Sequence, residues 1–79
     1  MTLTQLVQYL EQGRKIEFRL CEHEYFMAMT DSEGVYYIWD VIQKRDLVSG
    51  NLEDVLSYLF NGKICLKDNI EKFSFDYIL

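Results

Sequence analysis

The chain has 79 residues, of which 49% are hydrophobic and 15% aromatic, and a formal net charge of −5 from 13 acidic and 8 basic side chains. The apolar content excludes an intrinsically disordered chain, and two cysteines, four glycines and no proline exclude disulfide-rich and collagen-like proteins. The length allows one domain, residues 1–79, with one core. The acidic balance opposes direct nucleic-acid binding, which depends on Lys and Arg at phosphates.

The first predicted element is a helix that ends at Gly13. Thr2-Leu3-Thr4-Gln5 is typical of a capping box, with Thr2 as the N-cap and Gln5 three positions further on. The apolar residues at helical spacing are Leu3, Leu6, Val7 and Leu10. A glycine at position 13 is a common stop signal for a helix.

Strands are then predicted at residues 15–20, 25–29 and 35–42. In the first of these, Ile16, Phe18 and Leu20 alternate with polar residues, as in a half-buried strand. The third is rich in β-branched and aromatic residues, which favour strands. Turns are predicted at residues 22–24 and 31–34, and a further turn at 44–46 would lead into a short fourth strand at 47–48.

A second helix is predicted after Asn51, which is a suitable N-cap. Glu53 and Asp54 fall in its first turn, where negative charge is favourable. The helix is expected to end at Asn61-Gly62. Its apolar stripe consists of Leu52, Val55, Leu56, Leu59 and Phe60.

A short third helix is indicated by the spacing of Leu66, Ile70 and Phe73. Residues 73–79 alternate like a strand, although irregular packing of this tail is the alternative. Because the strand connections are short, we expect an antiparallel meander. The sequence therefore predicts an α+β domain, a three- to four-stranded antiparallel meander with helices packed on one face, in the order α-β-β-β-(β)-α-α.

Residues that carry catalytic or metal-binding chemistry are few. Cys21, His23 and Cys65 make up the whole Cys and His inventory, whereas a structural zinc site needs four ligands and a nucleophile–base pair needs an orienting group. We interpret His23 as an exposed turn residue and the cysteines as reduced, small packing residues. Nothing in the sequence indicates a pocket that would perturb a carboxylate pKa. We therefore predict no catalytic, cofactor-binding or metal-ligating residue, no cofactor and no enzyme.

Apolar side chains occupy both faces of the second and third predicted strands. A sheet that helices cover on one side ordinarily has polar residues on its other face. Two explanations stay open: the tail rings Phe73, Phe75 and Tyr77 cover this second face, or it is a contact surface, that of a homodimer included. The candidate contact residues are Phe26, Tyr36 and Ile38.

A meander also gathers acidic side chains at one end. The turn with Asp31 and Glu33 lies at the same end as the end of the first helix, and Glu53 and Asp54 arrive there if the fourth strand exists. The basic residues 14–15 would neutralise part of this charge. These carboxylates are either solvated turn and helix N-terminal residues, or an acidic edge that docks on a basic or nucleic-acid-binding protein.

Several stretches carry a resemblance to known proteins. They are Gly-Arg-Lys-Ile-Glu-Phe at 13–18, Tyr-Ile-Trp-Asp at 37–40, Gly-Asn-Leu-Glu-Asp-Val-Leu at 50–56, Phe-Asn-Gly-Lys at 60–63 and Leu-Lys-Asp at 66–68. With these the chain resembles small uncharacterised single-domain proteins of Gram-positive bacteria, their phages and mobile elements. The resemblance brings no functional motif. It implies a context in which small acidic proteins are often accessory factors, some of which block host defence nucleases, as anti-CRISPR proteins do.

These observations lead us to expect a cytoplasmic, non-catalytic protein-binding accessory module, related to a phage or mobile element, that acts by stoichiometric contact. One alternative is an acidic nucleic-acid-mimicking inhibitor of a host defence nuclease, and another is a self-associating structural protein. The expected partner is a protein, basic or nucleic-acid-binding, with no direct contact to nucleic acid or membrane and with a homodimer left open. No targeting segment is visible, and the longest apolar run, residues 35–39, is far below the ~18 residues of a membrane span.

Overall fold

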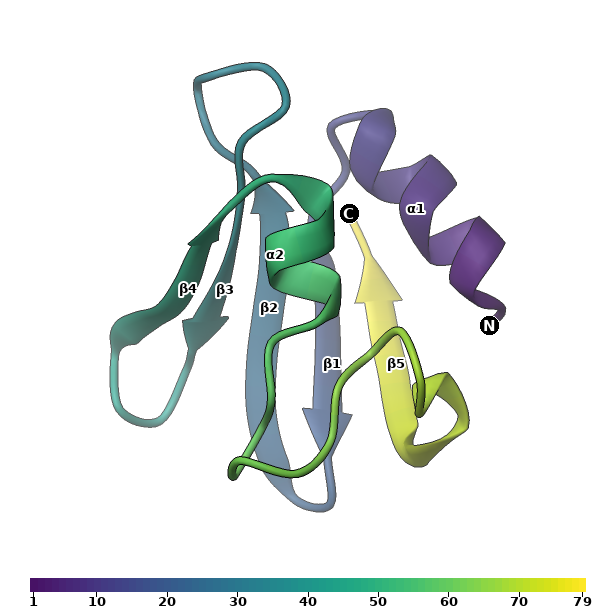
Figure 1. Ribbon diagram of the computed structural model, residues 1–79, viewed down its shortest axis with the longest axis vertical. Helices are drawn as coiled ribbons and strands as arrows, with labels where there is room; N and C mark the ends of the chain where they lie inside the picture. The colour runs from purple at the N-terminus through teal and green to yellow at the C-terminus, as the bar shows by residue number, and fades with distance from the viewer.

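The computed structural model describes residues 1–79 and contains one antiparallel sheet of five strands, in the order β4-β3-β2-β1-β5 (Figure 1). The strands are β1 Ile16–Leu20, β2 His23–Met29, β3 Tyr36–Asp40, β4 Arg45–Gly50 and β5 Phe73–Ile78. The helical elements are α1 Leu3–Glu11, α2 Leu52–Leu56 and the 3-10 turn η1 Ile70–Lys72. The predicted α+β class and antiparallel sheet are confirmed, but the order is α-β-β-β-β-α-β, with a fifth strand last.

Helix α1 forms as its sequence predicts. The Gln5 N–H donates to Thr2 Oγ1 at 3.1 Å, and the Thr2 N–H donates to Gln5 Oε1 at 2.9 Å, so the capping box is complete. Leu6 and Leu10 point into the core and are fully buried. Gly13 adopts φ +80, a left-handed conformation that glycine reaches without strain, and the chain turns there toward β1.

Two strand boundaries differ from the prediction. β2 begins at His23, because the β1–β2 turn consists of residues 21–22 rather than 22–24. β3 ends at Asp40 instead of about residue 42, because the Asp40 carboxylate accepts the Ile42 and Gln43 N–H groups at 3.0 and 2.9 Å and so bends the chain. The fourth strand exists and is longer than the predicted residues 47–48.

Helix α2 is shorter than predicted. Asn51 caps it as expected, through reciprocal hydrogen bonds with Asp54 of 3.0 and 2.9 Å. The helix ends early because Phe60 leaves the helical path to pair with Ile64 across a tight turn, and Phe60 is buried there. Leu59, predicted on the buried stripe, is 52% exposed. A short helix thus positions the turn that follows it.

The predicted third helix is wrong. Residues 65–72 contain no α-helix, only a turn at 66–68, closed by the Asn69 N–H donating to the Cys65 carbonyl at 3.0 Å, and the 3-10 turn η1. Leu66 is fully buried, and the Lys67 N–H donates to the Leu56 carbonyl at 3.0 Å. These anchors tie the segment to α2 and the core instead of allowing successive helical turns.

The tail forms a strand, which was one of the two predicted alternatives. β5 pairs antiparallel with β1 at the edge of the sheet, so its residues extend the sheet and do not cross its second face. Phe73 is buried in the core and Phe75 packs against it, whereas Tyr77 is 64% exposed. The explanation in which the tail rings cover the second sheet face is therefore wrong.

The core lies between the two α-helices and one face of the sheet, which we call the inner face (Figure 1). Inner-face residues alternate along each strand with those of the opposite side, which we call the open face. The helices contribute Leu6, Leu10, Val55 and Leu56 to the core. The central strands contribute Ile16, Phe18, Leu20, Tyr25, Met27, Tyr36 and Ile38. The predicted packing of helices on one face is confirmed.

Candidate functional site

Three aromatic side chains lie together on the open face, and we call them the aromatic cluster: Phe26 of β2 and Tyr37 and Trp39 of β3. Antiparallel pairing of β2 with β3 places Phe26 directly opposite Trp39. The ring centroids of Phe26 and Trp39 are 6.1 Å apart in a stacked arrangement, and those of Phe26 and Tyr37 are 6.0 Å apart edge-on. All three side chains are half-buried, and none belongs to the core. They form a continuous aromatic surface.

Charged side chains surround the aromatic cluster. The Lys15 ammonium lies 3.8 Å from the centroid of the Phe26 ring, a cation–π contact. A hollow of about 520 Å³ runs over the three rings and is bordered by Asp31 and Asp46. Glu17, in register with Phe26, carries no ion pair. The unpaired charge around the rings is therefore mainly acidic.

Further along this face, Arg19 of β1 is neutralised within the sheet. Its guanidinium forms two hydrogen bonds to the Asp76 carboxylate of β5, at 2.9 and 3.0 Å. Arg19 is in register with Glu24, so a second acidic side chain stands beside this pair. Arg19 consequently ties the last strand to the sheet and offers little free positive charge.

Of the predicted contact residues, Phe26 is on the open face but Tyr36 and Ile38 are not. Tyr36 is 5% exposed and Ile38 is fully buried, and both belong to the core. Their choice as contact residues is wrong, since β3 shows its other side to solvent. Asp40 lies on the same side of β3 as Tyr36 and Ile38, and a carboxylate in a strand ordinarily indicates the solvent-facing side. Here that carboxylate is buried, so Asp40 does not mark the solvent-facing side of β3.

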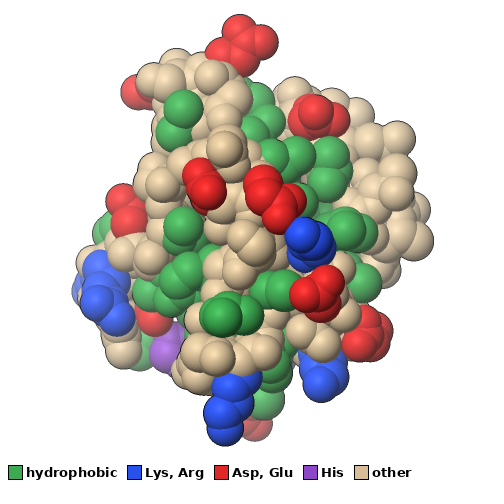
Figure 2. All heavy atoms as spheres, viewed as in Figure 1, with side chains coloured by type: hydrophobic (Ala, Val, Ile, Leu, Met, Phe, Trp, Pro, Cys, Tyr) green, Lys and Arg blue, Asp and Glu red, His purple; other side chains and the backbone are tan.

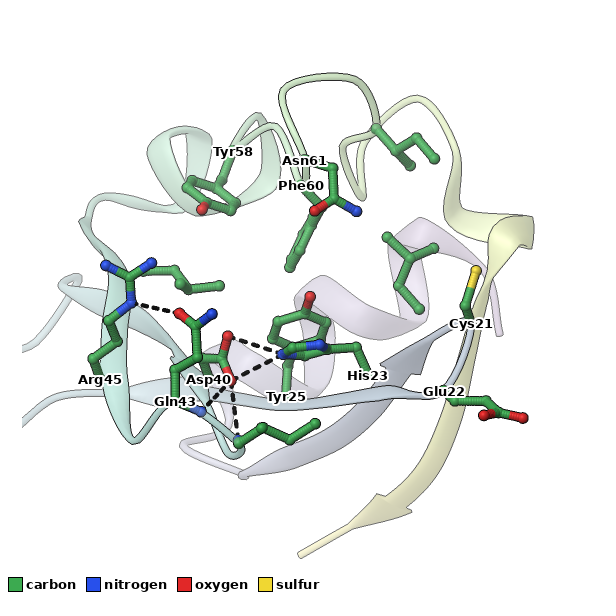
Figure 3. A pocket seen from close by; sticks show the side chains of 14 residues that line it. Cys21, Glu22, His23, Tyr25, Asp40, Gln43, Arg45, Tyr58, Phe60 and Asn61 are labelled. Carbon is green, nitrogen blue, oxygen red and sulfur yellow. Dashed lines mark hydrogen bonds and ion pairs between the residues drawn. The ribbon is translucent and has the colours of Figure 1, made fainter.

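A second candidate site, which we call the inner pocket, is a hollow of about 510 Å³ between the β1–β2 turn, the β3–β4 turn and the chain after α2 (Figure 3). Its apolar wall includes Tyr25, Tyr58 and Phe60, whose rings meet edge-on at centroid distances of 4.9 and 5.0 Å. The polar lining residues include His23, Asp40, Gln43, Arg45 and Asn61. No local sequence pattern indicates this pocket, because its residues come from three segments that are far apart along the chain.

His23 and Asp40 form a hydrogen-bonded pair in this pocket. His23 Nε2 lies 3.0 Å from both oxygens of Asp40, which is only 3% exposed. Burial by itself raises the pKa of Asp40, but hydrogen bonds from the Gln43 N–H, His23 and the Ile42 N–H outweigh it and lower the pKa. The ring of Tyr25 stacks on His23 at 4.8 Å, and burial and the Asp40 charge raise the Tyr25 pKa. The expectation that no pocket perturbs a carboxylate pKa is wrong.

The predicted environments of His23 and Cys21 also need correction. His23 is a half-buried strand residue held by Asp40, not an exposed turn residue. Cys21 is exposed at the β1–β2 turn, so it does not pack in the core, whereas Cys65 is buried as expected and donates to Asp68 Oδ2 at 3.3 Å. No group of three His, Cys, Asp or Glu side chains is arranged to hold a metal ion.

The four acidic residues predicted to share an edge lie at one end of the molecule. The β2–β3 loop carries Asp31 and Glu33, and the start of α2 carries Glu53 and Asp54; both segments are at the top of Figure 1. Figure 2 shows acidic side chains in the upper part of the helix-bearing face and Lys and Arg mainly in the lower part. The fourth strand returns the chain to this end, as the prediction required.

Part of this acidic charge is already used within the chain. Lys67 pairs with Glu53 at 2.8 Å, and Asp54 accepts the Asn51 N–H in the capping box. Arg14 and Lys15 do not neutralise the acidic end. Arg14 lies over the Tyr9 ring at 5.3 Å and donates to the Ile78 carbonyl, and Lys15 turns to the open face.

Comparisons with protein-family models, curated proteins and solved structures find no match to this chain. No helix in the structure is long and apolar enough to cross a membrane. Function must therefore be argued from the geometry of the open face and the inner pocket.

Proposed function

We propose that this protein is a non-catalytic protein-binding module that acts by stoichiometric contact through its open face, and that the partner presents basic side chains there. The observation that carries the proposal is the aromatic cluster on a sheet face that no helix covers. The resemblance noted above would make such a module an accessory factor of a phage or mobile element.

The energetics of the aromatic cluster favour its use as a contact centre. A fully buried aromatic side chain has removed roughly 150–250 Å² from water in total, and the three rings are only partly buried in the free protein, so the rest of that area is available to a partner. Trp and Tyr are the residues most enriched among those that dominate protein–protein binding energy. Trp39 and Tyr37 are also held in position by the strand backbone and by contact with Phe26, so little conformational entropy is lost on binding.

The charges around the cluster indicate what kind of partner fits. Asp46, Asp31 and Glu17 stand at the rim without ion pairs, against the single free cation Lys15. Arginine on a partner satisfies both parts of this surface, because its guanidinium stacks on aromatic faces and pairs with carboxylates. A basic protein surface is therefore the complementary occupant, and acidic rims steer such a partner at low salt.

To test the proposal, this protein is immobilised and incubated with a lysate of a Gram-positive host, and the retained proteins are compared at ~50 mM and ~500 mM salt. We expect wild type to retain one partner at a one-to-one ratio, more strongly at low salt. Trp39→Ala should weaken binding at least about tenfold, because it removes a central aromatic contact. Leu59→Ala is the control, because it removes an exposed apolar side chain from outside the open face.

Two outcomes would contradict the proposal. If Trp39→Ala retains the same partner as wild type, while Asp31→Lys with Glu33→Lys loses it, the acidic end is the contact and the nucleic-acid-mimicking inhibitor replaces the module proposed here. If the only species retained is the protein itself, the self-associating structural protein replaces it. Amide spectra of each variant verify that the fold is intact.

A further inference from the structure

The inner pocket contains an arginine, Arg45, that forms no ion pair within the chain. Arg45 Nε donates to Gln43 Oε1 at 2.8 Å. Figure 3 shows the terminal nitrogens of Arg45 at the rim of the pocket, on the side of Tyr58. The Tyr58 hydroxyl and the Asn61 amide also line the pocket and make no side-chain hydrogen bond within the chain. These are free donors directed at one hollow.

The negative charge in the pocket does not cancel this arginine. Both oxygens of Asp40 have partners, since Oδ1 accepts from the Ile42 and Gln43 N–H groups and both oxygens lie 3.0 Å from His23 Nε2. The remaining acidic lining residue, Glu22, is exposed in the β1–β2 turn. The rim at Arg45 is consequently a place where an anionic group finds a fork of donors without a competing carboxylate.

The body of the pocket is aromatic. Tyr58 is half-buried at the hollow, and the buried rings of Tyr25 and Phe60 pack behind it. The apolar lining also includes Leu20, Ile42, Leu47 and Ile64. A volume of about 510 Å³ is in the range of small-molecule sites, which combine an apolar lining with a few placed polar groups. Aromatic rings prefer the offset and edge-on contacts that a flat ligand would make here.

The backbone around the pocket has an unusual conformation. The only residues other than glycine with positive φ are Cys21, Lys44 and Asn61, each at φ 56. Cys21 and Asn61 line the pocket, and Lys44 stands between the lining residues Gln43 and Arg45. Non-glycine residues in this conformation cluster at ligand sites. Each of the pocket's three turns contains one of them.

From these observations we propose that the inner pocket is a binding site for a small aromatic carboxylic acid, with the carboxylate on Arg45 and the ring against the half-buried Tyr58 ring and Leu47. This site is on the helix-bearing side of the sheet and is separate from the open face, so it does not depend on the protein-binding role proposed above. The ligand would be bound as a whole, with no bond made or broken.

The probe is benzoate, titrated into ¹⁵N-labelled protein and followed by amide chemical shifts. We expect saturable shifts with a Kd in the low millimolar range, which is the order of affinity expected for a ligand of about nine heavy atoms. The shifts should be confined to residues 43–47 and 58–61. Benzamide and cyclohexanecarboxylate, which lack the charge and the aromatic ring respectively, should each bind several-fold more weakly. Phenyl phosphate tests whether the anion is a phosphate instead.

Two variants make the titration decisive. Arg45→Gln should weaken benzoate binding by about tenfold, because it removes one charge-assisted hydrogen-bonded contact. Lys44→Gln is the matched control, because it removes the same charge from the neighbouring turn position without touching the pocket, and it should bind benzoate like wild type. The proposal is overturned if benzoate gives no saturable shifts, if Arg45→Gln binds as wild type does, or if phenyl phosphate binds while benzoate does not.

Discussion

At the scale of single residues, Asp40 decides how the β3–β4 turn folds and how the sheet presents its rings. Its carboxylate ends β3, accepts two backbone N–H groups and holds His23. The pKa of Asp40 is lowered in the folded protein, so the unfolded chain binds the proton more tightly. The stability due to Asp40 is therefore fully present above its unfolded pKa of about 3.9 and is lost as pH falls through its folded pKa.

We expect Asp40→Asn to lower the free energy of unfolding at neutral pH by about 1–2 kcal/mol, since one amide oxygen still accepts the backbone N–H groups. Asp40→Ala should cost about 2–4 kcal/mol, because both N–H groups and His23 then lose their partner. Urea denaturation from pH 7 to pH 3 measures both. Asp46→Asn, an exposed Asp nearby, is the control. Equal acid sensitivity of Asp40→Asn and wild type would contradict this role.

The same residue limited what could be predicted of the open face. Alternation along residues 35–42 divides the apolar side chains correctly into two sets, but it does not say which set is buried. The Asp40 carboxylate can be buried because it has three hydrogen-bond partners, His23 and the Ile42 and Gln43 N–H groups. Tertiary structure brings these partners to it, so the sequence does not show that Asp40 is buried. Phe26 was placed correctly, but its neighbours Tyr37 and Trp39 were not among the predicted contact residues, because alternation does not identify the solvent-facing set.

At the scale of elements, α2 depends on its cap, because it has only five residues. Gly50 stands just before that cap, and a Cβ at Gly50 would overlap the Asp54 carboxylate. We expect Gly50→Ala to displace Asp54 from the Asn51 N–H and to lower stability by about 1–2 kcal/mol, and Asn51→Ala to cost about 1 kcal/mol. Thermal or urea unfolding of both variants measures the two losses.

A double-mutant cycle distinguishes this cap from a general packing effect. Because Gly50→Ala and Asn51→Ala disrupt one capping box, the double variant should lose less than the sum of the two single losses. Additive losses would mean that Gly50 acts on β4 alone. Gly62→Ala is not a useful control, since an alanine at φ +71 is strained for a reason unrelated to the cap.

Elements whose signals are local could be predicted from sequence, and those fixed by distant contacts could not. The α1 cap, the first hairpin strands and the Asn51 cap depend on neighbouring residues. The length of α2 depends on burial of Phe60 in a core that also contains Phe18 and Phe73, with ring centroids 6.0 and 5.3 Å from Phe60. The third helix could not be predicted for the same reason, because Leu66 is buried in the core and the Lys67 N–H binds the Leu56 carbonyl of α2.

At the scale of the whole molecule, the inner pocket is separate from the other two surfaces, which adjoin at Asp31. The acidic end lies along the β2–β3 loop and the start of α2, and the inner pocket lies among the turns on the helix-bearing side (Figures 1 and 3). The aromatic cluster occupies the opposite face, and Asp31 borders it. A two-fold homodimer through the open face would place each acidic rim against its own copy. Charge repulsion therefore opposes self-association while it favours a basic partner.

The oligomeric state should therefore depend on salt. At ~50 mM salt we expect light scattering to give the monomer mass of 9.5 kDa even at high protein concentration, because the net charge of −5 is poorly screened. At ~1 M salt the Debye length falls to about 3 Å, and weak association through the rings should raise the average mass. Trp39→Ala should abolish that rise, and Leu59→Ala should not. A stable dimer at low salt would instead mean that the open face is built for a second copy of this chain.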